Sequence, residues 1–408
     1  MKCIHVADLH LDRPFEGLGE LPEEFSLKLS QKNFQVFSAI IDEAIKEQVD
    51  LLLLVGDIFH QPRIPIYTQH LFIEEMKRLE KEQIQVVLTF GNHDYYDTNR
   101  YWFPFPKNVN VWKSETVETL VLTTRNQETV AISAFSYENR WIEQHQATKF
   151  PKRFSHVDYH IGCYHGELGT SENNRYAPFT LGELKEKNYD YWALGHIHQR
   201  KVVGEDPLVV YPGAPIGHTK KEQQCYYAAL IEFTGQQKQL EWKSFPFVEW
   251  KRINYQLTED NIPKQVILKE LFDAILEQIT DLSHTYFIEI TLESSPEYSL
   301  TEYEQQDILR YLQQESYQSF KQQVWVYQLI NETVIKDNQS AFGFLDKQLL
   351  HQFLQAYEQQ DMEDKALDPL YKQPILYTLL HENTSFKEAL LDQSKDFLEV
   401  EFQTKGGD

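Results

Sequence analysis

The sequence is poor in cysteine and has no long apolar stretch. Its three cysteines, none with CxxC spacing, argue against a disulfide framework and a thiolate metal site, and they fit a reducing cytoplasm. The most apolar patch before the second motif described below, residues 50–55, is far shorter than the roughly 20 residues of a membrane span. The N-terminus has one lysine and then a strand pattern. We therefore expect neither a membrane span nor a signal peptide.

Basic residues are also scarce, with 39 Lys and Arg against 62 Asp and Glu, a net charge of −23. This balance argues against non-specific binding of phosphate backbones by the whole surface. The charge is uneven, because residues 246–408 hold 13 basic and 29 acidic side chains and the first 245 hold 26 and 33. A nucleic-acid substrate is therefore expected only at the N-terminal part, where it needs local basic loops or a partner.

Five short motifs rich in acidic, histidine and amide side chains each follow an apolar run that is typical of a β-strand. They are Asp8-Leu9-His10, Gly56-Asp57-Ile58-Phe59-His60, Gly91-Asn92-His93-Asp94, His165-Gly166-Glu167 and Gly195-His196-Ile197-His198. Each motif therefore delivers a carboxylate, imidazole or carboxamide from the end of a strand. Such ligands without thiolate suit Mn²⁺, Fe²⁺ or Zn²⁺. Two such ions about 3.5–4 Å apart form a common device for hydrolysing phosphate esters.

The pattern of elements predicts an α/β protein. Strand patterns at 51–55 and 84–90 alternate with helical patterns at 33–48 and 67–82, which indicates a layer of parallel strands. Short strands dominate after residue 112, among them 118–123, 129–134 and 208–211, and they predict a second, mixed sheet facing the first. We expect a two-sheet β-sandwich flanked by helices over residues 1–245. A smaller α+β domain should follow at 246–336, and a helical segment at 337–408.

The motif series resembles that of the calcineurin-like metallophosphoesterase superfamily, and within it the SbcD/YhaO-type DNA repair exonucleases. Protein phosphatases of the superfamily have GDxVDRG and GNHE where this chain has GDIFH and GNHD, which favours the nucleases. The resemblance implies a two-sheet sandwich with metals at the sheet edge and a capping domain at 246–336. It also implies a homodimer that works with an SMC-like coiled-coil ATPase, for which residues 337–408 would be the docking segment.

The resemblance also implies a role for each motif residue. One divalent ion would be held by Asp8, His10, Asp57 and His198, and a second by Asp57, Asn92, His165 and His196. His93 would assist at the phosphate and the leaving oxygen, Asp94 would orient His93, and His60 would position the phosphate or terminal nucleotide. Manganese is the first expectation for both ions, with iron, zinc and magnesium as alternatives.

The predicted function is a metal-dependent DNA phosphodiesterase in DNA repair, an exonuclease with or without endonuclease activity. Two alternatives stay open: a phosphoesterase for nucleotides or other small esters, and a structural or regulatory subunit of an ATPase complex. Exonuclease polarity and strand preference do not follow from the sequence. Neither does the choice between substrate contact and ordinary loop packing for six further residues: Arg13, Arg100, Tyr101, Trp102, His218 and Lys220.

Overall fold

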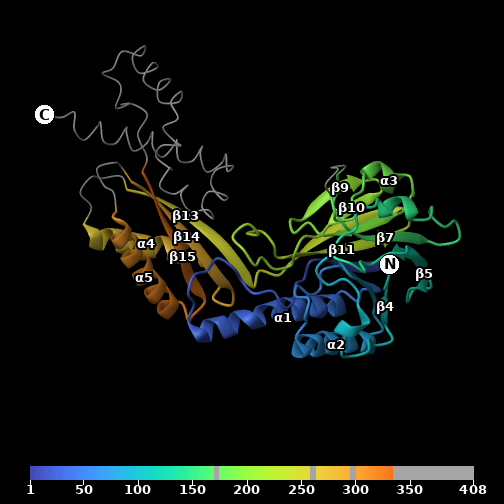
Figure 1. Ribbon diagram of the computed structural model, residues 1–408, viewed down its shortest axis with the longest axis horizontal. Helices are drawn as coiled ribbons and strands as arrows, with labels where there is room; N and C mark the ends of the chain where they lie inside the picture. The colour runs from blue at the N-terminus through green and yellow to red at the C-terminus, as the bar shows by residue number, and fades with distance from the viewer. Residues whose placement is uncertain (170–173, 258–262, 295–299, 334–408) are drawn as a thin grey trace, which may run out of the picture. The chain divides into compact units, whose positions relative to one another are not determined.

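The computed structural model describes residues 1–169, 174–257, 263–294 and 300–333 (Figure 1). The predicted docking segment at 337–408 lies outside these residues. The chain divides into two compact units. One comprises Met1–Ile253, Leu268–Ile290 and Asp307–Leu329, and it contains every predicted site residue. The described residues of the other lie within 254–267, 291–306 and 330–333.

The first sheet has six strands in the order β12-β11-β1-β2-β3-β4. Its strands are β1 (Lys2–Val6), β2 (Leu51–Val55), β3 (Gln85–Thr89), β4 (Val109–Val111), β11 (Tyr227–Thr234) and β12 (Gln237–Ser244). β1 to β4 run parallel, whereas β11 runs antiparallel to both β1 and β12. Val6 pairs with Leu54 and Val55 with Thr89, so the carboxyl ends of β1, β2 and β3 meet at one edge.

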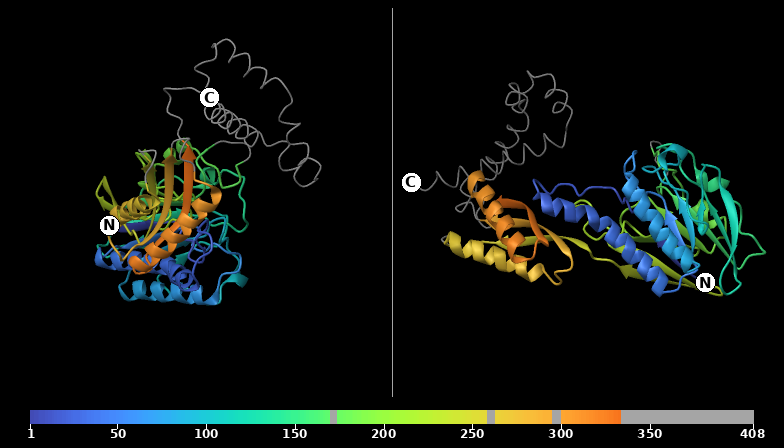
Figure 2. Two further views of the ribbon diagram at one scale, coloured as in Figure 1. Left: turned by 90° about the vertical axis from the view of Figure 1, so that its left-hand side faces the viewer. Right: turned by 90° about the horizontal axis from the view of Figure 1, so that it is seen from below.

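Helices α1 (Glu23–Lys46) and α2 (Ile66–Lys81) cover one face of this sheet (Figures 1 and 2). Alternation along β2 explains the layering, because Leu52 and Leu54 join the core beneath the helices while Leu51 and Leu53 join the core between the sheets. A strand buried on both faces reads as an unbroken apolar run, which is what β2 is. The helices and the second sheet therefore hold β2 from opposite sides.

The second sheet has the order β5-β6-β7-β8-β10-β9. Its strands are β5 (Glu118–Thr123), β6 (Thr129–Ala134), β7 (Tyr159–His165), β8 (Tyr191–Gly195), β9 (Lys201–Glu205) and β10 (Leu208–Tyr211). β6, β7, β8 and β10 are parallel. An aromatic-rich core lies on the outer face, with the 3₁₀ turn η2 (Gln146–Lys149) and the short helix α3 (Leu181–Lys185) beside it. The predicted two-sheet sandwich flanked by helices is confirmed.

A third, three-stranded sheet has the order β13-β14-β15. It is formed by β13 (Val248–Gln256), β14 (Thr285–Ser294) and β15 (Val324–Thr333), which alternate along the chain with helices α4 (Lys264–Gln278) and α5 (Glu302–Ser319). This is the α+β alternation expected from the sequence. The boundaries of the three predicted domains stay a prediction. In the part of the chain that the structure describes, no helix combines the length and the apolar character that crossing a bilayer requires.

Candidate metal centre

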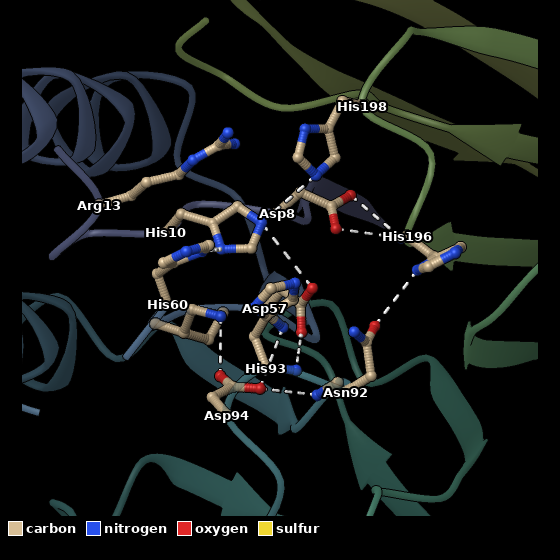
Figure 3. Close-up of polar contacts among 12 residues, drawn as sticks. Asp8, His10, Arg13, Asp57, His60, Asn92, His93, Asp94, His196 and His198 are labelled. Carbon is tan, nitrogen blue, oxygen red and sulfur yellow. Dashed lines mark hydrogen bonds and ion pairs between the residues drawn. The ribbon is translucent and has the colours of Figure 1, made fainter. Parts of the chain in front are cut away.

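The strand-end motifs of both sheets converge on one site (Figure 3). Asp8, Asp57 and Asn92 follow β1, β2 and β3 of the first sheet, whereas His165 ends β7 and His196 follows β8 of the second. Parallel strands in register place their carboxyl ends together, so Asp8 and His196 become neighbours although they are 188 positions apart in the sequence. All the predicted metal-site residues lie at this edge.

The backbone at this edge includes several non-glycine residues in the unfavourable left-handed conformation. Asp8, His10, Asp57 and His196 all have positive φ, at 54°, 42°, 53° and 100°. Non-glycine residues seldom adopt this conformation, and it costs of the order of 1–3 kcal/mol where it occurs. A Cβ on Gly91 would lie 2.3 Å from Asp57 Oδ1 and 2.7 Å from His165 Nε2, so only glycine fits there. The strain accompanies a dense cluster of ligand-type groups.

The first predicted ion site combines Asp8, His10, Asp57 and His198. Ligand atoms of Asp8, His10 and His198 all lie within 4.8 Å of one another. His10 Nε2 lies 3.3 Å from His198 Nε2 and 3.7 Å from Asp57 Oδ2. Ligand atoms about 2.1 Å from one ion are roughly 3–3.5 Å apart, so this spacing fits a shared cation. Asp8 also accepts hydrogen bonds from the His196 backbone N–H at 3.1 Å.

The second predicted site combines Asp57, Asn92, His165 and His196. Asn92 Oδ1 lies 3.2 Å from both His165 Nε2 and His196 Nδ1. Asp57 Oδ2 is 3.5 Å from His165 Nε2, in addition to its approach to His10. The other Asp57 oxygen accepts the His93 backbone N–H at 3.0 Å. One carboxylate oxygen therefore faces both groups of ligands, which is the position that a bridging carboxylate requires.

Two imidazoles are oriented by hydrogen bonds on their far side. His165 Nδ1 donates to the Val55 carbonyl oxygen at 3.0 Å, and His198 Nδ1 lies 2.6 Å from Glu222 Oε1. These bonds leave Nε2 of each ring directed into the site. Such outer partners fix the tautomer and the ring orientation of metal ligands. Glu222 was missed by sequence reasoning, because it lies 24 residues beyond His198 in a segment without a recognisable motif.

Electrostatics favour a cation at this position. Burial raises the pKa of Asp8 to about 6, although nearby His165 and His198 oppose the shift. Burial also raises the pKa of Asp94 to about 7, with the Asp57 charge adding to it. Carboxylates that are costly to ionise in a buried cluster are stabilised as anions by a bound cation. The donor set and its spacing fit divalent metal ions.

His93 and His60 lie beside the ligands. Their rings stack with centroids 4.6 Å apart, and the His93 ring lies 5.1 Å from that of His10. Ligand atoms of His10, His60 and His93 also fall within 4.8 Å of one another. Asp12 fixes the turn of His60 by accepting its backbone N–H at 2.5 Å. Both rings are half-buried, so they border the ligand cluster without being enclosed by it.

Asp94 acts differently from the sequence prediction, which assigned it to the imidazole of His93. Its oxygens accept backbone N–H groups instead, from Gly91 at 2.7 Å, Ile58 at 2.7 Å and Asp57 at 3.2 Å. A fully buried aspartate therefore joins the turn after β2 to the turn after β3. The reason is geometric, because both turns present unpaired N–H groups at the point where Asp94 is buried.

Five of the six residues left open by the sequence have side chains with internal partners. Arg100 donates to the carbonyl oxygens of Pro62, Tyr95 and Gln61, which ties the loop after β3 to the loop after β2. Arg13 pairs with Glu16 and Glu222, His218 is buried against Asn33, and the Tyr101 ring packs on the helix-side core. Trp102 is 67% exposed, and Lys220 pairs with Glu289 while staying half-exposed.

Comparison with known proteins identifies the domain. Residues 1–200 match the model of the calcineurin-like phosphoesterase family. The chain carries a calcineurin-like phosphoesterase domain. This match spans all five strand-end motifs, so the metal centre lies within the matched region.

Similar proteins include both phosphoesterases and nucleases. An uncharacterized metallophosphoesterase YhaO of Bacillus subtilis is 35% identical over 63% of this chain and 63% of its own length. The SbcD component of nuclease SbcCD of Bacillus subtilis is 22% identical over 62% of this chain and 73% of that protein. The DNA double-strand break repair protein Mre11 of Methanopyrus kandleri is 25% identical over 53% of this chain and 49% of that protein. The chain thus spans just under two thirds of the first of these relatives.

Proposed function

We propose that this phosphoesterase is a divalent-metal-dependent nuclease that hydrolyses DNA phosphodiesters from strand ends. The observation that carries the proposal is the position of Asp57 Oδ2, which faces His10 on one side and His165 on the other. Two further imidazoles, His60 and His93, stack beside this pair. Ligand groups on two sides of one carboxylate, with two further imidazoles next to them, suit an in-line displacement at phosphorus.

The residues divide into binding and assisting groups. Asp8, His10, Asp57, Asn92, His165, His196 and His198 would hold two divalent ions. When bound, these ions supply Lewis acidity and activate water for hydrolysis. His93 presents a ring beside the ligands, where it gives a hydrogen bond or a proton to the leaving oxygen. His60, on a turn held by Asp12, positions the phosphate or the terminal nucleotide.

DNA is favoured over small phosphate esters by two observations. The SbcD component of nuclease SbcCD and Mre11 of Methanopyrus kandleri each align with more than half of this chain. His60 extends the second motif to GDIFH, a feature that distinguishes the chain from protein phosphatases of the same superfamily. The domain's own net charge is only moderately acidic, because the first 245 residues hold 26 basic and 33 acidic side chains.

One assay tests the function. The full chain with Mn²⁺ is incubated with end-labelled linear DNA and, separately, with closed circular DNA, using Asp57→Asn as the inactive control. We expect loss of label from linear DNA, with no such loss by the variant. Turnover of a chromogenic diester with intact DNA would establish the small-ester alternative. Metal binding without hydrolysis of either substrate would establish a structural or regulatory role.

The proposal extends to assembly and location. We propose an SMC-like coiled-coil ATPase as partner, docked through residues 337–408, and a homodimer in the cytoplasm. The support is the likeness to the SbcD component of nuclease SbcCD and to Mre11. Co-purification with such an ATPase, and the mass of the isolated protein in solution, test these two points separately.

A further inference from the structure

A basic pocket lies next to the metal centre on the side of His198. Its volume is about 590 Å^3 (cubic ångströms). Its lining includes Arg200, Lys220, Lys221 and Arg252 as well as Glu222. Glu222 is the carboxylate that bonds His198 Nδ1, so one residue both lines the pocket and contacts the candidate ligand His198. Four cationic side chains around one pocket are unusual in a chain with a net charge of −23. The pocket therefore has an electrostatic character opposite to that of the whole chain.

The carboxylates near this pocket do not neutralise it. Glu222 is fully engaged, since Oε1 faces His198 and Arg13 while Oε2 accepts the backbone N–H groups of His218 and Thr219. Both oxygens of Glu222 therefore already have internal partners, one of which is the cation Arg13.

The second carboxylate is shared by two cations. Buried Glu289 accepts Arg252 Nε at 2.7 Å and Lys220 Nζ at 3.3 Å. One negative charge for two positive ones leaves an excess of cation. Among the described residues, no carboxylate lies within 4 Å of Arg200 or Lys221. The pocket therefore offers uncompensated positive charge.

Arg200 is held in place without an acid. Its guanidinium carbon lies 3.7 Å from the ring centroid of Tyr227 and 5.5 Å from that of Trp242. Stacking on two aromatic rings fixes a guanidinium while its N–H edge stays available. Because the charge is positioned by aromatic faces, an incoming anion does not have to displace an internal partner.

We infer that this pocket binds backbone phosphates of the DNA strand that flank the phosphate under attack. Arg200 follows the ligand His198 by only two residues, so an anion in the pocket lies next to the metal centre along the same path. The pocket recognises charge and not base identity, since its lining supplies cations and glutamine amides but no free aromatic face. This inference rests on the proposed nuclease function and adds a strand-binding subsite to it.

The test uses the double variant Arg200→Gln/Lys221→Gln of the full chain, because neither residue leaves a carboxylate unpaired. Affinity for single-stranded DNA is measured across a salt series with the metal centre loaded. Each phosphate contact on a single strand contributes about 0.7 to the slope of log affinity against log salt, so we expect the magnitude of the slope to fall by about 1.4 when two contacts are lost. KM for the DNA strand should rise relative to that for a single chromogenic diester, which has no flanking phosphates.

Two matched controls isolate the pocket. Arg200→Lys/Lys221→Arg keeps both charges and should keep most of the slope. Lys149→Gln/Lys185→Gln removes two exposed cations that do not line the pocket, and it should leave the slope at the wild-type value. A slope that falls equally in this control would mean that only net charge matters, and it would overturn the inference.

The outcomes separate this inference from the function itself. If wild type digests DNA and the Arg200→Gln/Lys221→Gln variant has an unchanged salt slope, the subsite is refuted while the nuclease stands. If wild type turns over the small diester but neither binds nor cuts DNA, the proposed function fails and the subsite fails with it. If the variant keeps its DNA slope but loses binding of polyglutamate, the pocket takes an acidic polypeptide and the inference is wrong.

Discussion

Single side chains decide how the metal ligands are held, and the bond from His198 to Glu222 is the clearest case. Despite burial, which opposes it, the Glu222 carboxylate raises the pKa of His198. The same carboxylate fixes the ring so that Nε2 points at His10. Glu222 lies outside all five motifs, so no spacing in the sequence indicates this role. The candidate ligands could be located from the sequence because each lies at or shortly after the end of an apolar strand.

Replacing Glu222 with Gln should weaken metal binding by roughly 10- to 100-fold, the usual effect of losing an outer partner of a metal ligand. The amide can still accept one hydrogen bond but carries no charge to support His198. Calorimetric titration of the metal-free protein measures the affinity. Glu16→Gln is a matched control, because Glu16 also pairs with Arg13 but contacts no ligand. Equal affinities in the two variants would mean that Glu222 has no such role.

His93→Asn separates bond cleavage from metal binding. His93 bonds Asp57 through its backbone N–H and not through its ring, and asparagine retains that backbone group. We expect both ions to be kept and DNA affinity to persist, while cleavage falls by roughly 10²–10⁴-fold, the usual contribution of one positioned proton donor. Metal content by mass spectrometry and single-turnover cleavage provide the two readouts. Loss of either ion would show that His93 supports the metal turns structurally.

At the scale of elements, apolar patterns predicted most of the strands well. The patterns at 51–55, 118–123, 129–134 and 208–211 coincide with β2, β5, β6 and β10. The short β4, the exposed β9 and β12 were not predicted. β12 is half exposed with alternating polar residues, so it has no apolar run. Helix α1 begins at Glu23, ten residues before the predicted start, because Phe25 and Leu29 extend its buried face through a polar stretch.

The turns that carry the ligands tolerate no side chain at their glycines. We expect Gly91→Ala to abolish binding of the ion at Asn92 and His165, because the new Cβ would lie 2.3 Å from Asp57 Oδ1 and 2.7 Å from His165 Nε2. Gly182→Ala is a suitable comparison, since a Cβ there meets only Thr180 Oγ1, at an ordinary contact distance of 3.8 Å. Two-site metal binding that survives in Gly91→Ala would contradict the packing argument.

The second sheet has a pH-sensitive histidine remote from the metal site. Buried His160 accepts the Phe154 N–H at Nδ1 and bonds Ser133 at Nε2, and burial lowers its pKa to about 4. Between pH 6.5 and 4 the unfolded chain binds this proton and the folded chain does not. As the pH is lowered from 6.5 to 4, the free energy of unfolding should therefore decrease by about 1.4 kcal/mol for each pH unit. Urea unfolding of wild type and His160→Gln measures the difference, and parallel pH profiles would refute it.

Across the whole molecule, basic side chains are concentrated in the part of the chain that contains the candidate metal centre. Every residue of the metal centre lies between Asp8 and Glu222, in the part that holds 26 of the 39 basic side chains. Residues 337–408 hold 14 acidic and 6 basic side chains and none of the site residues. Sequence patterns alone bear on this segment, since it lies outside the described residues. Its acidic charge does not suit contact with DNA. Its apolar positions are therefore expected to contact either a protein partner or the rest of their own chain.

Ending the chain before Asp337 should therefore preserve metal-dependent hydrolysis and abolish binding to the coiled-coil ATPase. The apolar positions from Phe344 to Tyr357 recur with helical spacing, as in amphipathic helices that dock in a groove or on a coiled coil. Hydrolysis of a chromogenic diester and gel filtration with the ATPase give the two readouts, with the full chain as reference. A truncated protein that still binds the ATPase but has lost its metal-dependent activity would show that the segment supports the catalytic domain instead.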